Sequence, residues 1–267
     1  MLDSFFVGLQ FLTRISIVKQ TVWTEESFGK SVKFFPAVGA VLGLVYVVLA
    51  EILNLLIGDA FPMLTAAVIL VSMTILTGGI HCDGFMDTMD GLFSGRDRER
   101  MLEIMKDSRV GAFGVVSFVM LSILDFAALS ELSRTSTLTL FAAIYSAPII
   151  GRLMMVVTIG GFPYARPNGM GKAFAAYTTR STIILAAFEV LVLLLPLILL
   201  SAMLAESLLI SLTIALTFTL YFGKFTTKKV GGVTGDIYGA IEIISEALVM
   251  VSFLSSCYYL KKMVGAE

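Results

Sequence analysis

Seven long apolar stretches constrain this chain more than any other feature of its sequence. With 57% hydrophobic and only 15% charged residues, the chain lacks the composition of an ordinary soluble domain. A helix needs about 20 apolar residues to cross a bilayer. The sequence therefore predicts an all-α, polytopic membrane bundle of about seven transmembrane helices around a polar cavity that opens to the cytoplasm. The predicted spans are residues 34–57, 61–80, 112–132, 138–160, 182–204, 207–222 and 239–260.

The distribution of charge between these spans predicts the topology. Fifteen of the 19 Lys and Arg residues lie in the N-terminal segment and in the connections after the second, fourth and sixth spans. Such basic segments face the cytoplasm, so we expect a multi-pass protein of the cytoplasmic (inner) membrane, embedded in bilayer lipid. With an odd number of spans, Lys261 and Lys262 would lie on the side opposite the cytoplasm, although basic residues favour the cytoplasmic side. The number of spans and the side of the C-terminus therefore stay open.

One integral membrane domain, residues 1–267, is the simplest organisation, because the chain shows no repeats and no linkers. Residues 1–33 carry apolar side chains at helical spacing, which predicts an amphipathic helix on the membrane surface or a helix packed against the bundle. Cys82 and Cys257 form no metal or redox pattern. Nothing indicates a nucleic-acid partner, and the sequence leaves both a monomer and a homo-oligomer open.

Three aspartates stand in a polar stretch between the second and third predicted spans, at Asp83, Asp87 and Asp90. If the stretch is helical, their i, i+4, i+7 spacing places all three on one face. Carboxylates this close repel one another unless a cation neutralises them. Mg²⁺ is commonly held by one or two carboxylates together with substrate phosphates. We therefore predict that these aspartates are catalytic residues that bind Mg²⁺.

Cationic side chains follow the aspartates and suit phosphate groups. Guanidinium and ammonium groups bind phosphate oxygens through charge-assisted hydrogen bonds. Carboxylates followed by cations indicate a phosphoryl-transfer site, whereas the alternative is a solvated helix start followed by a basic cytoplasmic loop. The cations are Arg96, Arg98, Arg100, Lys106 and Arg109.

A second polar segment, residues 231–246, leads into the last predicted span. Its glycines let the backbone approach a ligand closely. Thr234 and Asp236 either cap a helix or contact a metal or phosphate. Glu242 and Glu246 lie one turn apart, and two carboxylates inside a membrane helix need a cation, a basic partner or protons. They either complete the metal site with Asp236 or pair with a basic residue of another span.

Four further polar residues each have two interpretations. Arg152, inside the fourth predicted span, is either the partner of the glutamate pair or a substrate-binding cation. His81 is either a ligand or proton carrier in the site, or an ordinary loop residue. Arg166 and Lys172 either contact an anionic substrate or only set the topology.

Four segments together resemble the cobalamin synthase family, formally adenosylcobinamide-GDP ribazoletransferase or cobalamin 5′-phosphate synthase. The central segment, residues 78–114, is the most specific of them. Residues 11–15, 35–39 and 232–246 agree with the family in order and spacing. The resemblance covers essentially the full length, although the apolar spans between the segments add nothing to it.

This resemblance implies a Mg²⁺-dependent phosphotransferase that acts in cobalamin biosynthesis, at the last assembly of the nucleotide loop. The family joins adenosylcobinamide-GDP to α-ribazole or its 5′-phosphate, forms adenosylcobalamin or its 5′-phosphate, and releases GMP. By resemblance the three aspartates carry the metal, and Lys106, Asp107 and Arg109 act at the pyrophosphate. Arg96 and Arg98 are further candidates to hold the phosphates. The ribazole 3′-hydroxyl would attack the phosphate nearer cobinamide, with His81 or one of the acids taking its proton.

Two alternatives from other classes fit the residues less well. A CDP-alcohol phosphotransferase also uses an Asp-rich membrane site, but there the Asp-Gly pair is followed by Ala-Arg, whereas here Arg96 is the first arginine after Asp83. A cation-coupled transporter would use Arg152, Glu242 and Glu246 along an ion path. The Asp-rich stretch, however, has no matching half elsewhere in the chain.

Overall fold

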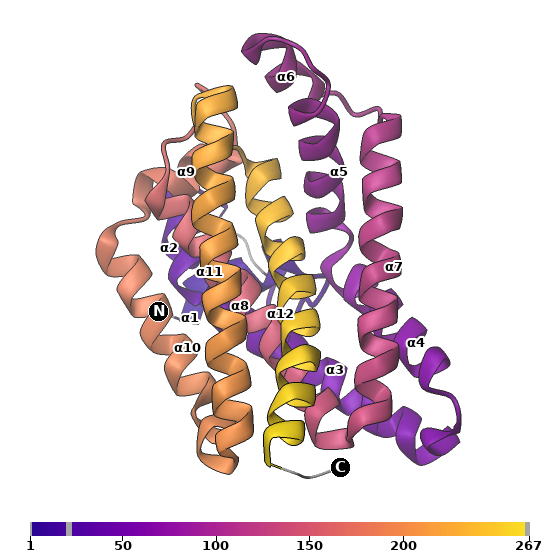
Figure 1. Ribbon diagram of the computed structural model, residues 1–267. Helices are drawn as coiled ribbons and strands as arrows, with labels where there is room; N and C mark the ends of the chain where they lie inside the picture. Colours follow the sequence, from indigo (N-terminus) through magenta and orange to yellow (C-terminus); the bar gives the residue numbers. More distant parts are fainter. Residues whose placement is uncertain (1, 20–22, 265–267) are drawn as a thin grey trace.

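The computed structural model describes residues 2–19 and 23–264. Residues 1, 20–22 and 265–267, which belong to the predicted single domain, lie outside the described part. Within it, the chain is a bundle of α-helices with two short 3-10 turns, Val32–Phe34 and Gly58–Ala60 (Figure 1). The helices are α1 (Leu2–Leu12), α2 (Glu25–Ser31), α3 (Phe35–Ile57), α4 (Pro62–Thr77), α5 (Ile80–Leu92), α6 (Arg98–Ile104), α7 (Ala112–Thr135), α8 (Thr137–Gly161), α9 (Met170–Tyr177), α10 (Arg180–Leu200), α11 (Ala202–Val230) and α12 (Gly235–Val264).

The predicted polytopic helical architecture is confirmed. In the described part, 6 helical stretches are long and apolar enough to cross a membrane, and the number rises to 7 if α4 and α5 count as one broken span. Each predicted span corresponds to one of α3, α4, α7, α8, α10, α11 and α12. The predicted sixth span was too short, because α11 continues past the apolar residues until Gly231 ends it in a left-handed conformation.

The Asp-rich stretch is a helix of the bundle and not a loop between spans. Gly78 and Gly79 have φ angles of 64° and 72°, a region that side-chain-bearing residues rarely adopt. They end α4, and the chain turns by 89° into α5. The predicted span 61–80 therefore extended a few residues past α4, which ends at Thr77, because average hydropathy does not register a turn made by two glycines.

Two inner helices form the core of the bundle. The apolar segments of α8 and α12 are 83% and 72% buried, whereas that of α10 is 17% buried and faces outward. On α3, a Cβ at Gly39 would lie 2.3 Å from the Pro148 carbonyl oxygen, and one at Gly43 would lie 2.6 Å from that of Tyr145. The close helix approach that small residues permit therefore occurs between α3 and α8.

Helix α1 packs against the bundle. It buries Val7, Leu9 and Leu12, and the Phe11 ring contacts those of Phe28 in α2 and Phe174 in α9. At one end of the bundle lie the last turn of α5, α6, α9, the end of α11 and the start of α12 (Figure 1). The basic connections after the second, fourth and sixth predicted spans belong to this end, hereafter the basic end.

Candidate active site

Glycines bring α5 and α12 into backbone contact. A Cβ at Gly84 would lie 2.9 Å from the carbonyl oxygen of Asp236, and one at Gly239 would lie 3.3 Å from Cα of His81. Larger residues at these positions would separate the helices. The contact therefore joins the Asp-rich stretch to the start of the last span, two segments that are far apart in the sequence.

A cavity of about 230 Å³ lies where these helices meet, hereafter the site cavity. Its wall includes the acidic residues Asp83 from α5 and Asp236 from α12, together with His81. Its apolar side is formed by residues of α1, α8, α9 and α12. These are Phe11, Leu12, Met155, Met170, Phe174 and Tyr238.

The three aspartates of α5 have different surroundings. Asp90 is buried, and its carboxylate accepts hydrogen bonds from the backbone N–H groups of Gly111 (2.6 Å) and Gly114 (2.9 Å) at the start of α7. The carboxylates of Asp83 and Asp87 make no hydrogen bond or ion pair with any residue that the structure describes. Two carboxylates one turn apart are therefore available for a cation, while the third anchors the first turn of α7.

A short pairing of two connections places a cation beside Asp236, in the wall of this cavity. Val233 N donates to Pro163 O, and Ala165 N donates to Val233 O, both at 2.8 Å. Arg166 follows directly, and its Nη2 lies 2.7 Å from Oδ2 of Asp236. Asp87 also interacts electrostatically with Asp83, Asp236 and Arg166. The site therefore combines three carboxylates with one guanidinium.

Thr234 is the N-cap of α12, as one of its two interpretations predicted. Its Oγ1 accepts a hydrogen bond from Ile237 N at 3.3 Å and donates to Oδ2 of Asp236 at 3.2 Å. The cap fixes the first turn of the helix. It also orients the Asp236 carboxylate toward the site cavity.

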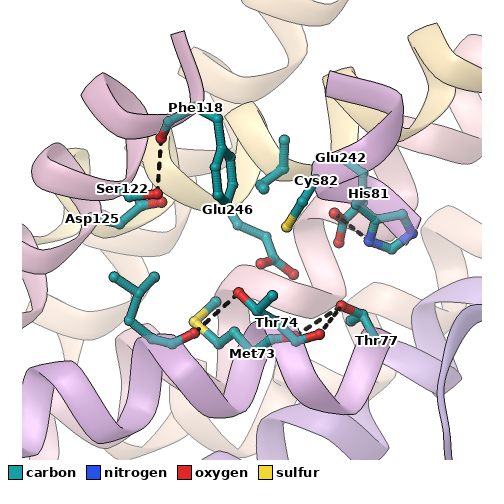
Figure 2. A pocket seen from close by; sticks show the side chains of 12 residues that line it. Met73, Thr74, Thr77, His81, Cys82, Phe118, Ser122, Asp125, Glu242 and Glu246 are labelled. Carbon is teal, nitrogen blue, oxygen red and sulfur yellow. Dashed lines mark hydrogen bonds and ion pairs between the residues drawn. The ribbon is translucent and has the colours of Figure 1, made fainter. Parts of the chain in front are cut away.

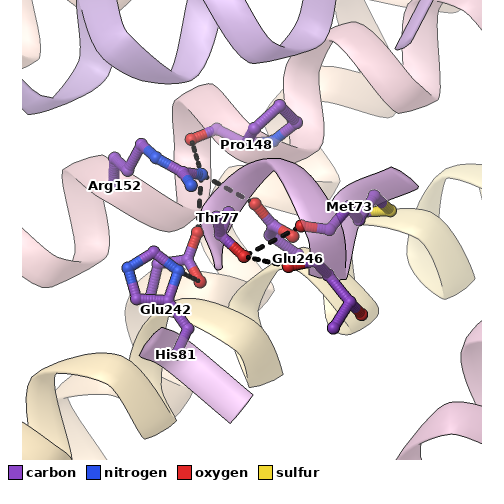
Figure 3. A network of polar contacts seen from close by, with 8 residues as sticks. Met73, Thr77, His81, Pro148, Arg152, Glu242 and Glu246 are labelled. Atoms are coloured by element: carbon purple, nitrogen blue, oxygen red, sulfur yellow. Dashed lines mark hydrogen bonds and ion pairs between the residues drawn. The ribbon is translucent and has the colours of Figure 1, made fainter. Parts of the chain in front are cut away.

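A buried ionic network (Figure 3) adjoins the site through His81, which lines the site cavity. Nη1 of Arg152 lies 2.6 Å from Glu242 Oε1 and 2.8 Å from Glu246 Oε1, and Nδ1 of His81 lies 2.8 Å from Glu242 Oε2. The pairing of the two glutamates with Arg152 is thus confirmed. These four side chains tie α5, α8 and α12 together, hereafter the Arg152 network. The assignment of Glu242 and Glu246 as metal ligands stays a prediction, and their contacts favour a role in positioning.

A small polar pocket of about 50 Å³ adjoins this network (Figure 2). Asp125 of α7 and Glu246 of α12 line it together with Ser122, Cys82 and His81. His81 also lines the site cavity, so its imidazole stands between the two spaces. Asp125 is an acid within a long apolar run of the sequence, where a charge usually faces the interior of the bundle, but its neighbours could not be recognised from the sequence.

The comparisons with known proteins agree with the motif-based resemblance. Residues 4–254 match the family model described as cobalamin-5-phosphate synthase. The chain belongs to this family. It is 39% identical to "Adenosylcobinamide-GDP ribazoletransferase" of Desulfitobacterium hafniense over 95% of this chain and 97% of the relative. It is 35% identical to the protein of that name from Fusobacterium nucleatum, with the same coverage. No solved structure matches the chain.

In this cobalamin-5-phosphate synthase family member, the predicted phosphate-binding cations lie outside the site cavity. Arg96, Lys106 and Arg109 are exposed, and the Arg98 guanidinium packs against Gly231 at the end of α11. They gather at the basic end, around α6. Their role toward phosphate therefore stays a prediction.

Asp107 pairs with its neighbour Arg109 on the surface. The distance between Oδ2 of Asp107 and Nη2 of Arg109 is 2.8 Å. The hydrogen bond from Arg109 lowers the pKa of the Asp107 carboxyl to about 2. Asp107 therefore remains ionised throughout the neutral range, which suits the orientation of a cation better than the donation of a proton.

Proposed function

We propose that this chain is a membrane-bound adenosylcobinamide-GDP ribazoletransferase, the name that its relatives carry. It would join adenosylcobinamide-GDP to α-ribazole or α-ribazole 5′-phosphate and release GMP. One observation carries the proposal: in a chain of this family, Asp83 and Asp236 line one cavity, Asp236 pairs with Arg166, and Asp87 interacts electrostatically with all three. Carboxylates for a metal beside a guanidinium for phosphate are what phosphoryl transfer requires.

The reaction is a substitution at one phosphorus atom of the pyrophosphate. The ribazole 3′-oxygen bonds to the phosphorus nearer cobinamide, and the bond from that phosphorus to the bridging oxygen of the pyrophosphate breaks. The bridging oxygen leaves with the bonding electron pair as part of GMP. The hydroxyl proton passes to His81 or to one of the site's acids.

The donor set of the site fits Mg²⁺. Among residues 2–19 and 23–264, no group of three or more His, Cys, Asp or Glu is arranged to hold a metal ion on its own. Mg²⁺, however, commonly needs only one or two carboxylates and takes substrate phosphates for the rest. Asp83 and Asp87 would hold it, with Asp236 nearby. When bound, Mg²⁺ would neutralise the negative charge of the pyrophosphate.

The protein's own side chains position and neutralise the reactants. Arg166 would share its guanidinium between Asp236 and a phosphate oxygen. Glu242 holds the His81 ring by Nδ1, and Arg152 balances part of the charge of the glutamates. The apolar side of the site cavity excludes water from the reacting phosphate.

We place the site at the cytoplasmic face of the inner membrane. Support comes from the basic end, where the start of α12 and the Arg166 connection lie, because Lys- and Arg-rich connections face the cytoplasm. The two alternatives lose their basis: the chain matches a different family from the CDP-alcohol enzymes. Arg152 and Glu242, which a transporter would use along an ion path, pair with each other at 0% and 1% exposure.

Release of GMP tests the proposal. The purified protein in liposomes would be given adenosylcobinamide-GDP, α-ribazole 5′-phosphate and Mg²⁺, and both products would be quantified by chromatography. We expect GMP and cobamide in equal amounts, and neither product in the presence of EDTA. Folded protein that yields no GMP with either ribazole would refute the proposed function.

A further inference from the structure

A second cavity shares Asp83 with the site cavity. Its volume is about 590 Å³, compared with about 230 Å³ for the site cavity. It lies between the end of α1, the turn that joins α4 to α5, and α7, and we call it the Arg14 cavity. Both cavities include Phe11, Ile80 and Asp83 in their walls. Asp83 therefore belongs to the walls of both cavities.

The Arg14 cavity carries one cation, which the fold holds in place. The Arg14 backbone N–H donates to Leu76 O at 2.7 Å, and its guanidinium packs over Gly78, where a Cβ would lie 2.0 Å from Nε. Within the described part of the chain, this guanidinium has no hydrogen bond or ion pair. An arginine that is held at a cavity without a carboxylate partner is suited to bind an anion, above all a phosphate.

The rest of the wall suits a nucleoside. Gln10, Thr13, Thr74 and Thr77 provide amide and hydroxyl groups, which can bind ribose hydroxyls. Phe11, Met86 and Phe118 provide apolar surface for a flat aromatic base. Asp236 and its partner Arg166 do not line this cavity. The pyrophosphate site and the Arg14 cavity are therefore chemically distinct neighbours that meet at Asp83.

We propose that the Arg14 cavity binds the ribazole substrate and that Arg14 binds its 5′-phosphate, an inference that rests on the proposed function. The 3′-hydroxyl would then point past Asp83 toward the pyrophosphate, while the 5′-phosphate takes no part in bond making or breaking. Free and phosphorylated ribazole differ only in this group. Arg14 is therefore the specificity-determining residue that makes α-ribazole 5′-phosphate the preferred acceptor.

The test compares the two acceptors. With saturating adenosylcobinamide-GDP, kcat/KM for GMP release would be measured with α-ribazole 5′-phosphate and with α-ribazole, in wild type, Arg14→Gln and Arg14→Lys. We expect the wild type to prefer the phosphorylated acceptor. This preference should fall roughly tenfold or more in Arg14→Gln, mainly through KM, because a charge-assisted hydrogen bond is lost, and less in Arg14→Lys. Arg180→Gln, an exposed arginine at the start of α10, serves as the matched control and should keep the wild-type preference.

A measurement on the wild type keeps the proposal testable if Arg14→Gln does not fold. Inorganic phosphate should inhibit competitively against α-ribazole 5′-phosphate and should not compete with adenosylcobinamide-GDP. The inference would be overturned by a wild type that prefers free α-ribazole, by an unchanged preference in folded Arg14→Gln, or by phosphate that competes only with adenosylcobinamide-GDP. Absence of GMP with both acceptors would instead reject the proposed function itself.

Discussion

Nη1 of Arg152 in α8 lies 2.6 Å from Oε1 of Glu242 in α12, and both side chains are almost fully enclosed. The same nitrogen contacts Glu246 at 2.8 Å, and Glu242 in turn holds His81 of α5. Charges are expensive inside a membrane protein unless they are paired. This network therefore couples the stability of the bundle to the position of the helix that carries Asp83 and Asp87.

Arg152→Met should destabilise the protein strongly. It leaves Glu242 and Glu246 buried without their cation, and removal of one partner from a buried pair costs about 3–5 kcal/mol. We expect a clear fall of Tm in detergent. A triple variant that adds Glu242→Gln and Glu246→Gln removes the uncompensated charge and should recover part of the loss. Arg100→Met, which breaks an exposed pair with Glu103, is the control and should leave Tm unchanged. An unaltered Tm in Arg152→Met would contradict the role given to the network.

Asp90→Asn should act mainly on stability. Asp90 accepts the N–H groups of Gly111 and Gly114, so loss of its charge and of one acceptor weakens the first turn of α7. Such caps contribute about 0.5–2 kcal/mol. We expect a lower Tm with partly retained GMP release, as measured on the same preparation. Complete loss of turnover at wild-type Tm would instead assign Asp90 to the metal, as the sequence predicted.

Gly84→Ala should separate α5 from α12. The new Cβ would meet the Asp236 carbonyl oxygen at 2.9 Å and its Cα at 3.2 Å, so backbone must move within the site. We expect turnover to fall by at least about tenfold, since small misplacements of a site are costly. Gly161→Ala, whose Cβ would meet nothing within 4 Å, provides the matched control. Equal activities of the two variants would show that the backbone contact is not needed.

Arg166→Gln should weaken the binding of adenosylcobinamide-GDP. Its guanidinium lies 2.7 Å from Asp236 and also interacts electrostatically with Asp87. Loss of a charged hydrogen bond, about 1.5–3 kcal/mol, predicts a KM that rises roughly ten- to a hundredfold. Steady-state kinetics would measure it, with Arg180→Gln as the control. A wild-type KM in Arg166→Gln would contradict the assignment of Arg166 as a phosphate-binding residue.

The apolar runs were sufficient to predict the helical architecture, because the length and composition of a membrane span are local properties. The spacing of Asp83 and Asp87 likewise predicted their common face. Long-range partners could not be predicted in this way. Asp90 finds its partners only when α7 packs beside α5, and Arg166 reaches Asp236 only because Val233 pairs with the connection before it.

The Arg152 network also shows that long-range partners cannot be predicted from local sequence. The sequence showed a glutamate pair and an intramembrane arginine, and it left both pairing and metal binding open. Only the packing of α8 against α12 brings Arg152 within 2.8 Å of Glu246. The turn at Gly78 and Gly79 was also missed, and this turn directs Asp83 into the site.

Turnover of Asp83→Asn and Asp87→Asn in liposomes tests the central claim most directly. GMP release from adenosylcobinamide-GDP and α-ribazole 5′-phosphate would be measured across a Mg²⁺ titration, with Tm recorded on the same samples. Because both carboxylates lack partners in the described structure, the account predicts wild-type Tm or higher and loss of nearly all turnover. Wild-type turnover with an unchanged Mg²⁺ dependence in either variant would contradict the assignment of the site.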